Sequence, residues 1–209
     1  MKIKIPEKTE KIARLSDSPL YVVGGAVRNA YLGLERPFDL DLAGNIPTEK
    51  FIDMLERAGL SVTAEYKRTG TVMFFDEGVK CEYTRFRTDS YAVGGGHNPK
   101  EVRFTDDIKE DALRRDFKCN AVYYDVKSGE KVDPLCGVSD IEKRVLDTVD
   151  DTEKVFSHDG LRLMRLARFS GELGFIPEKD LLAAAKEYAA NIKDVSAERI
   201  FAELKAILK

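Results

Sequence analysis

Two short segments near the N-terminus constrain the fold most: a glycine pair after an apolar run, and two aspartates separated by one residue. Leu20–Val23 has the apolar pattern of a buried strand and leads into Gly24 and Gly25. Residues 27–34 have the pattern of a short helix, and residues 38–43 alternate apolar and acidic side chains. The sequence therefore predicts a strand-to-helix turn close to a strand that has one acidic face.

The acidic strand carries Asp39 and Asp41. Side chains two residues apart on a strand leave from the same face, so the two carboxylates are expected to lie together. Two such carboxylates repel each other unless a cation lies between them, and oxygen ligands suit Mg²⁺. A pair of Mg²⁺ ions can activate a hydroxyl and carry a triphosphate. Solvated acids on an exposed strand would explain an isolated pair better, but the nearby glycines favour the metal site.

The glycine pair stands where free backbone N–H groups and the helix dipole favour a phosphate. Arg28, near the start of the predicted helix, carries a guanidinium that can bind the same phosphates. The spacing matches neither GxGxxG nor GxxxxGK[ST], which argues against a dinucleotide fold or a P-loop. The alternative is a tight turn with Arg28 on the surface.

Two further sets of polar side chains are candidates for the same site. Glu82, in the strand-like residues 79–87, is a candidate third metal ligand or base, although an ordinary acid on an edge strand fits almost as well. Arg115 and Asp116, with Asn120 four residues on, combine donors and a carboxylate that suit triphosphate and ribose hydroxyls. The alternative for Arg115 and Asp116 is a surface ion pair, which contributes little to stability.

Residues 156–173 read as one helix that carries Asp159, Arg162, Arg165 and Arg168. Residues three apart on a helix are neighbours, so Asp159 and Arg162 are expected to share one face. An acceptor beside a forked donor can pair with the edge of a nucleobase, and the further arginines continue a basic stripe. The alternative is an amphipathic helix with a charged outer face.

The remaining pattern divides the chain near residue 150. Before it, we expect helices at residues 48–58 and 107–113, strands at 61–66, 71–75 and 118–126, and a mobile loop at 88–100. After it, we expect helices at residues 156–173, 178–190 and 197–208. The third helix ends as the chain stops, which suggests a fragment of a longer protein. We therefore predict an α+β domain over residues 1–150 and an all-helical segment over residues 151–209.

Composition excludes several classes of protein. A hydrophobic content of 43% with 7 prolines is typical of a globular chain. The 3 cysteines form no CxxC pair, which argues against a disulfide framework or structural zinc. No apolar run reaches the ~20 residues of a membrane span, and the N-terminus lacks a secretory signal. We therefore expect a cytoplasmic protein without a membrane partner, of undetermined oligomeric state. The net charge of −3 does not exclude nucleic acid, because 34 Lys and Arg can gather on one face.

In this order, the motifs resemble those of class II tRNA nucleotidyltransferases and bacterial poly(A) polymerases over nearly all 209 residues. The segments Gly24-Gly25-Ala26-Val27-Arg28 and Asp39-Leu40-Asp41 resemble the catalytic motif that holds the triphosphate and two Mg²⁺ ions. The segment from Arg114 to Ala121 resembles the motif that binds the ribose and phosphates of the nucleotide. Asp133-Pro134-Leu135-Cys136-Gly137 resembles the hinge between a catalytic head and a helical neck.

The resemblance extends to the helical segment. Asp159-Gly160-Leu161-Arg162 resembles the amino-acid template in which Asp and Arg select CTP and ATP, and Arg165 and Arg168 match arginines that assist nucleotide binding. Two residues depart from the family pattern, because Asn29 stands where an aspartate is usual and His158 where a glutamate orients the arginine. The departures put in question a contact at the start of the helix and the geometry of the template.

The resemblance implies an α+β nucleotidyltransferase head with a mixed β-sheet flanked by helices, followed by an all-helical neck. It implies addition of CMP, AMP or both, from CTP and ATP, to a tRNA 3′ end by two-metal nucleotidyl transfer. A poly(A) polymerase acting on other RNA 3′ ends, and a nucleotide-binding module without turnover, remain alternatives. The family also implies body and tail domains that grip tRNA, for which this chain has no room.

Overall fold

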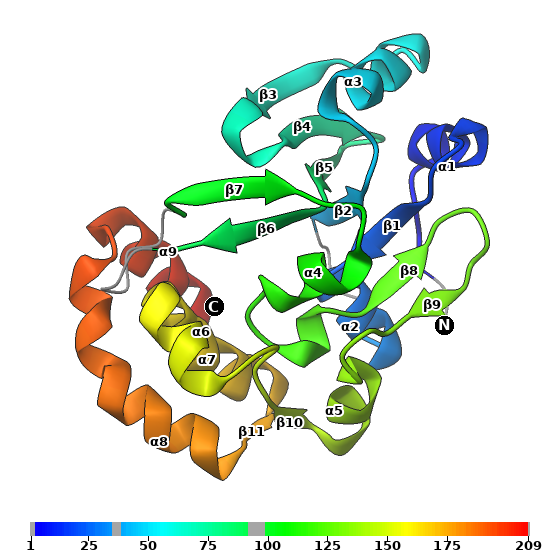
Figure 1. The fold of residues 1–209 in the computed structure, drawn as a ribbon. Helices are drawn as coiled ribbons and strands as arrows, with labels where there is room; N and C mark the ends of the chain where they lie inside the picture. Colours follow the sequence, from blue (N-terminus) through cyan, green and yellow to red (C-terminus); the bar gives the residue numbers. More distant parts are fainter. Residues whose placement is uncertain (1–2, 35–38, 92–98, 209) are drawn as a thin grey trace.

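A seven-stranded mixed sheet forms the centre of the N-terminal part of the molecule, in the strand order β3-β4-β5-β2-β1-β8-β9. The structure, a computed structural model, describes residues 3–34, 39–91 and 99–208 (Figure 1). The strands are β1 (Leu20–Val23), β2 (Leu40–Gly44), β3 (Val62–Tyr66), β4 (Thr71–Asp76), β5 (Val79–Arg85), β8 (Tyr123–Asp125) and β9 (Lys131–Val132). Strands β2 and β5 pair in parallel and the other neighbours pair antiparallel, so the expected mixed sheet is confirmed.

Helices flank this sheet, as expected. They are α1 (Glu7–Leu15), α2 (Gly25–Tyr31), α3 (Thr48–Arg57), α4 (Ile108–Leu113) and α5 (Gly137–Lys143). On α3, Phe51 stacks on the ring of Tyr83 from β5 at a centroid distance of 3.9 Å. Both side chains are fully buried, so their contact fixes α3 against the sheet. Sequence analysis missed α1, which Asp76 holds by accepting hydrogen bonds from the backbone N–H and hydroxyl of Thr9, both at 2.8 Å.

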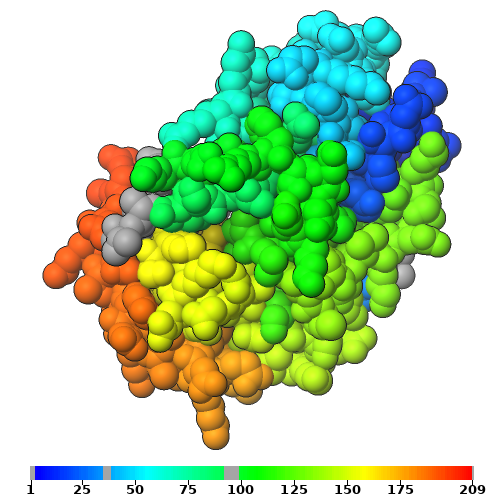
Figure 2. Space-filling view, in the orientation of Figure 1, coloured from blue at the N-terminus to red at the C-terminus, as the bar shows by residue number. Residues whose placement is uncertain are grey.

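Two small sheets join this part to the C-terminal helices. One is an antiparallel hairpin of β6 (Arg87–Ser90) and β7 (Glu101–Phe104), and the other a parallel pair of β10 (Val145–Leu146) and β11 (Ile176–Pro177). In the space-filling view the green hairpin lies directly against the yellow helices that follow residue 150 (Figure 2). The 3₁₀ helices are η1 (Lys67–Thr69), η2 (Lys118–Asn120) and η3 (Tyr188–Asp194).

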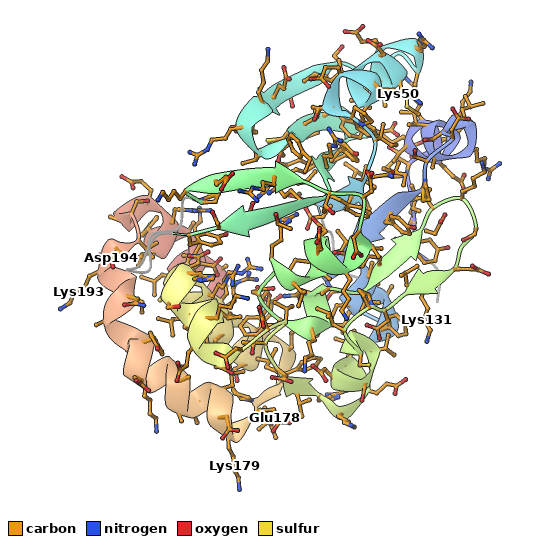
Figure 3. The ribbon with its side chains drawn as sticks, in the orientation of Figure 1. Lys50, Lys131, Glu178, Lys179, Lys193 and Asp194 are labelled. Carbon is orange, nitrogen blue, oxygen red and sulfur yellow. The ribbon has the colours of Figure 1, made fainter. Side chains whose placement is uncertain are left out.

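The C-terminal part is helical, as predicted. It contains α6 (Thr152–His158), α7 (Leu161–Leu173), α8 (Lys179–Glu187) and α9 (Ala197–Ile207). Phe169 on α7 packs edge-on against Phe117 of the preceding part, with ring centroids 5.9 Å apart, so one hydrophobic core spans both parts. Lys179 and Lys193 project from the outer edge of this part (Figure 3). No helix within the described ranges is long and apolar enough to cross a membrane.

The prediction of a single helix over residues 156–173 is wrong. The chain leaves α6 at Asp159, whose backbone is extended with φ −150° and ψ 102°, and α7 begins after Gly160. The Asp159 carboxylate accepts a hydrogen bond from the backbone N–H of Leu161 at 3.0 Å and so caps the new helix. Asp159 and Arg162 therefore do not share a helix face, although they remain close in space.

Three other local predictions need correction. Residues 118–126 are not a continuous strand, because η2 forms first and only Tyr123–Asp125 pairs in the sheet. The loop predicted at residues 88–100 is wrong at its start, where Arg87–Ser90 pairs with Glu101–Phe104. Residues 92–98, including the predicted glycine-rich stretch, lie outside the described residues, as does Phe38. The predicted helix at 178–190 ends at Glu187 and continues as η3.

Candidate functional site

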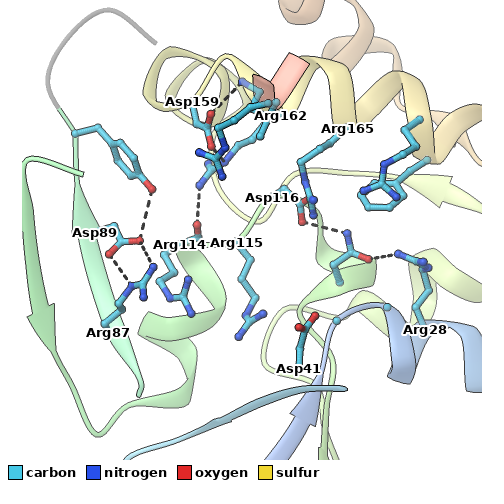
Figure 4. Close-up of a pocket in the computed structure, with 18 residues that line it drawn as sticks. Arg28, Asp41, Arg87, Asp89, Arg114, Arg115, Asp116, Asp159, Arg162 and Arg165 are labelled. Carbon is cyan, nitrogen blue, oxygen red and sulfur yellow. Dashed lines mark hydrogen bonds and ion pairs between the residues drawn. The ribbon is translucent and has the colours of Figure 1, made fainter. Parts of the chain in front are cut away.

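A cavity of about 420 Å³ lies between the central sheet, the β6–β7 hairpin and the C-terminal helices (Figure 4). Its lining is dominated by charge. Among the described residues around it are eight arginines and four aspartates: Arg28, Arg87, Arg114, Arg115, Arg162, Arg165, Arg168, Arg199, Asp41, Asp89, Asp116 and Asp159. The excess of guanidinium groups suits a polyanionic ligand, because arginine forks match phosphate oxygens.

The cavity brings together nearly every predicted site residue. Those that line it are Gly24, Gly25, Arg28, Asp41, Arg115, Asp116, Asn120, Asp159, Arg162, Arg165 and Arg168. Asp39 and Glu82 lie outside the lining. Asp39 is exposed at the start of the acidic strand, where its carboxylate pairs with the ammonium of Lys80 at 3.1 Å.

The glycine turn packs directly on the acidic strand. Gly24 precedes α2 with φ 81° and ψ −140°, a conformation that glycine adopts without strain. A Cβ atom at Gly24 would stand 3.1 Å from the Oδ2 atom of Asp41. The missing side chain therefore lets the start of α2 approach the Asp41 carboxylate.

Asp41 and Glu82 are direct neighbours in the parallel pairing of β2 with β5. Asp41 is exposed on β2, yet desolvation of its carboxyl within the recess and the nearby charge of Glu82 raise the pKa of Asp41 to about 6. A cation would relieve this unfavourable charge. Among the described residues no group of three or more His, Cys, Asp or Glu side chains is arranged to hold a metal ion. The carboxylates available here are therefore Asp41, its neighbour Glu82 on β5, and Asp39 just before β2, which pairs with Lys80.

Arg28 is buried beneath the cavity, so the alternative of a surface side chain is wrong. Its Nη1 atom donates to Asn120 Oδ1, and its Nη2 atom donates to Asn29 Oδ1 at 3.0 Å. Its Nε atom has no hydrogen-bond partner among the described residues. Asn29, the departure noted in the sequence, is thus a neutral acceptor that helps to fix the guanidinium of Arg28.

Asp116 connects the sheet domain to α7. Its Oδ2 atom accepts hydrogen bonds from Arg165 Nε at 2.7 Å and Nη2 at 2.6 Å, and its Oδ1 atom accepts one from Asn120 Nδ2 at 3.1 Å. Burial alone would raise the pKa of Asp116, but Arg165 and the hydrogen bonds outweigh it and bring the pKa to about 2. The side chain is buried, so the alternative of an exposed ion pair is wrong.

Arg115 is held by a residue that sequence analysis did not single out. Asp111, fully buried on α4, accepts from Arg115 Nη2 at 2.9 Å and from Arg114 Nε at 2.7 Å. The Tyr123 hydroxyl donates to the same carboxylate at 2.7 Å. Burial opposes ionisation of Asp111, yet these partners hold its pKa well below its usual value. The sequence offered one signal for this contact, because Asp111 on a predicted helix precedes Arg114 by three residues and Arg115 by four.

Asp159 and Arg162 face the cavity from the break between α6 and α7. Both are 6% exposed, and Asp159 Oδ2 lies 4.0 Å from Arg162 Nε. Arg162 also donates to two backbone carbonyls, from Nη2 to Arg114 at 2.6 Å and from Nη1 to Val155 at 3.3 Å. Burial raises the pKa of Asp159. The predicted acceptor and forked donor therefore do lie side by side.

The basic stripe continues along α7 but is paired with acids. Arg168 Nε donates to Glu203 of α9 at 2.7 Å, and its Nη1 atom to Glu172 at 3.3 Å. Its guanidinium carbon stands 4.2 Å from the centre of the Phe169 ring. The lining also contains charged or aromatic residues that were not among the predicted site residues, which are Arg87, Asp89, Tyr91, Arg114, Phe169 and Arg199.

The sequence was compared with known families and proteins. The family described as "Poly A polymerase head domain" matches residues 20–147. The chain belongs to this family. A second family, "Probable RNA and SrmB- binding site of polymerase A", matches residues 174–209 of this family member.

Named relatives of this poly A polymerase head-domain protein are CCA-adding enzymes. Those of Bacillus pumilus (strain SAFR-032) and Streptococcus sanguinis (strain SK36) are each 36% identical to it over 189 residues. The alignments cover 90% of this chain, but 46% and 45% of the two enzymes. The chain thus spans about half the length of the curated relatives it matches.

Solved structures show the same fold. The crystal structure of the Bacillus stearothermophilus CCA-adding enzyme in complex with CTP matches with a TM-score of 0.83 and 31% identity, over 97% of this chain and 48% of that one. A tRNA nucleotidyltransferase complexed with a primer tRNA and an incoming ATP analog matches with a TM-score of 0.73 and 26% identity, over 95% and 58% of the two chains.

Proposed function

We propose that this chain is the catalytic part of a nucleotidyltransferase that adds CMP, AMP or both, from CTP and ATP, to the 3′ end of a tRNA. The observation that carries the proposal is the meeting of the Gly24 turn, Asp41 and an arginine-rich lining in one cavity. The CTP and tRNA complexes of similar proteins support the choice of substrates. In this proposal, residues 1–150 form the catalytic head and residues 151–209 form the helical neck.

Asp39 and Asp41 are the proposed ligands of two Mg²⁺ ions, with Glu82 as a third ligand or a base. Such ions would supply activation of the RNA 3′-hydroxyl and charge neutralisation at the triphosphate when bound. The position of Asp41 beside Glu82 and the raised pKa of Asp41 support the assignment, because a divalent cation would offset the repulsion between the two carboxylates. The residues themselves act mainly by positioning and by electrostatic stabilisation.

The lining divides into two proposed roles. The triphosphate and ribose contact the head and the arginines of α7, through Gly24, Gly25, Arg28, Arg115, Asp116, Asn120, Arg165 and Arg168. The base lies against Asp159 and Arg162, whose acceptor and donor fork can pair with the edge of cytosine or adenine. Both sets line the same cavity (Figure 4).

Incorporation of label into RNA tests the proposal. The chain is incubated with Mg²⁺, labelled CTP or ATP, and tRNA that lacks its CCA end or an unrelated RNA. Incorporation into the tRNA is the expected result. Addition of AMP to the unrelated RNA would instead identify a poly(A) polymerase, the activity after which the matched head family is named. Nucleotide binding without incorporation would identify a binding module without turnover.

A paired variant tests the metal ligands. Asp39→Ala together with Asp41→Ala should abolish incorporation. The matched control, Asp17→Ala with Glu65→Ala, removes the same charge from exposed positions outside the cavity and should leave incorporation unchanged. Incorporation by the Asp39/Asp41 variant at the rate of the unaltered chain would refute the assignment.

A further inference from the structure

Tyr91, the residue after β6, contacts His158 and Arg162, which lie on either side of Asp159 in the sequence. Its ring stacks on the imidazole of His158, with centroids 5.2 Å apart and planes inclined by 21°. The guanidinium carbon of Arg162 lies 6.0 Å from the centre of the same ring. One aromatic side chain from the head thus lies between the last residue of α6 and the first turn of α7.

Tyr91 is itself anchored to the head. Its hydroxyl donates to Asp89 Oδ2 at 3.5 Å, and the Asp89 carboxylate pairs with Arg87 Nε at 3.0 Å. The Asp89 side chain is 3% exposed. Arg87 in turn donates from Nη1 to the carbonyl of Thr69 at 2.7 Å. The position of the Tyr91 ring is therefore determined by a chain of contacts that ends in η1, beside the central sheet.

His158, which Tyr91 contacts, is a residue at which this chain departs from the family pattern. The family pattern has a glutamate there that orients the arginine, whereas an imidazole ring cannot pair with a guanidinium as a carboxylate does. Burial and the nearby Arg162 charge lower the pKa of His158, which favours the neutral ring. The Arg162 Nη atoms donate to backbone carbonyls, and the Tyr91 ring, stacked on His158, lies near its guanidinium carbon.

We propose that Tyr91 and His158 form a positioning pair that fixes the orientation of Arg162 and thereby helps to set which nucleobase the site accepts. The inference rests on the proposed role of Asp159 and Arg162 in reading the base. It assigns part of the base selectivity to β6, a head strand that sequence analysis had taken for a loop. The contacts proposed for the triphosphate come from other residues, so the pair should affect base recognition and leave triphosphate affinity unchanged.

The test compares the affinity of the full chain for CTP, ATP and inorganic tripolyphosphate by calorimetry. Tyr91→Ala and His158→Ala should each weaken CTP or ATP binding about three- to tenfold and change the ratio of the two affinities, which is the scale of an aromatic and cation–π contact. The affinity of each variant for tripolyphosphate should stay within about twofold of that of the unaltered chain. Tyr91→Phe and His158→Phe keep a ring and should restore most of the affinity.

Matched controls separate positioning from folding. Tyr66→Ala removes an exposed tyrosine from β3, outside the cavity, and should change none of the three affinities. Tyr91→Leu and His158→Gln fill space without the stacked pair and give the same comparison if an alanine variant unfolds. Equal loss of tripolyphosphate affinity, or alanine variants with unchanged CTP and ATP affinities, would overturn the positioning role. An unaltered chain that binds tripolyphosphate but neither nucleotide would refute base reading by Asp159 and Arg162, and this inference with it.

Discussion

Gly160→Ala is expected to destabilise the junction between α6 and α7. The backbone of Gly160, with φ −61° and ψ −22°, is one that alanine adopts readily, so the effect does not come from backbone strain. It comes from space, because an added Cβ would stand 2.3 Å from the carbonyl oxygen of Asn191 and 2.7 Å from its carbonyl carbon. Both are backbone atoms of η3, which no change of rotamer can move. The substitution must therefore push η3 away from the junction.

The expected magnitude follows from overpacking, which costs about 1–3 kcal/mol when a methyl group is forced into a filled site. Gly171→Ala is the matched control, because it lies in α7, the helix that Gly160 precedes, and its added Cβ would have no atom within 4 Å beyond the nearby backbone of its own helix. In a helix interior that replacement stabilises by about 0.5–1 kcal/mol. The two variants should therefore differ by about 2–4 kcal/mol in free energy of unfolding.

Urea unfolding measures this difference, and hydrogen–deuterium exchange locates it. Faster exchange is expected in η3 and at the end of α6, since Asn191 Nδ2 also donates to the carbonyl of Phe156 at 3.2 Å. Equal stability of the two variants would refute the steric argument. A loss of stability in Gly160→Ala without faster exchange in η3 would show that the added methyl acts elsewhere.

Four further predictions concern residues of the cavity. The pKa of Asp116 lies below its value of 3.8 in the unfolded chain, so its pairing with Arg165 should add about 2 kcal/mol to the free energy of unfolding above pH 3.8. This contribution should be lost as the pH falls through about 2. Between pH 5 and 2, the free energy of unfolding of Asp116→Asn should therefore depend less on pH than that of the unaltered chain. The pKa of Asp41 is about 6, so Mg²⁺ affinity measured by calorimetry should fall about tenfold per pH unit below that value. At pH 7, Asp41→Asn should raise the melting temperature of the metal-free chain, because it removes a charge beside Glu82. Gly24→Ala forces a side chain into a backbone conformation suited to glycine, and unfolding experiments should show a loss of about 1–3 kcal/mol.

Most residues of the cavity could be predicted from the sequence, whereas the backbone conformation that places them could not. Local periodicity identified strands such as Leu20–Val23 and the helices of the C-terminal part, since each is amphipathic or buried over its own length. The same periodicity runs without interruption through residues 156–173, so it could not reveal the break at Asp159. That break depends on the contact of Gly160 with Asn191, a residue about thirty positions away, which no local pattern records.

The residues that sequence analysis missed share this dependence on distant partners. Arg87 ends a predicted strand, and Asp89 and Tyr91 stand in the polar stretch after it, which is typical of a loop. The strand β6 forms there because it pairs with β7, and Tyr91 after it stacks on His158 of α6. Asp111 was missed for a different reason, because an acid in a short helix is usually exposed and this one is completely buried.

The pairing of the cavity arginines with acids bears on how the proposed site would bind a triphosphate. Arg115 is fixed by Asp111, Arg165 by Asp116 and Arg168 by Glu203. A long, flexible guanidinium loses roughly 2 kcal/mol of side-chain entropy when it is immobilised. Here the protein's own carboxylates hold the side chains in place before any ligand arrives, while the excess of arginines over aspartates keeps the lining positive. The carboxylates therefore favour binding of a phosphate by preorganising its donors, even though their charge by itself opposes an anion.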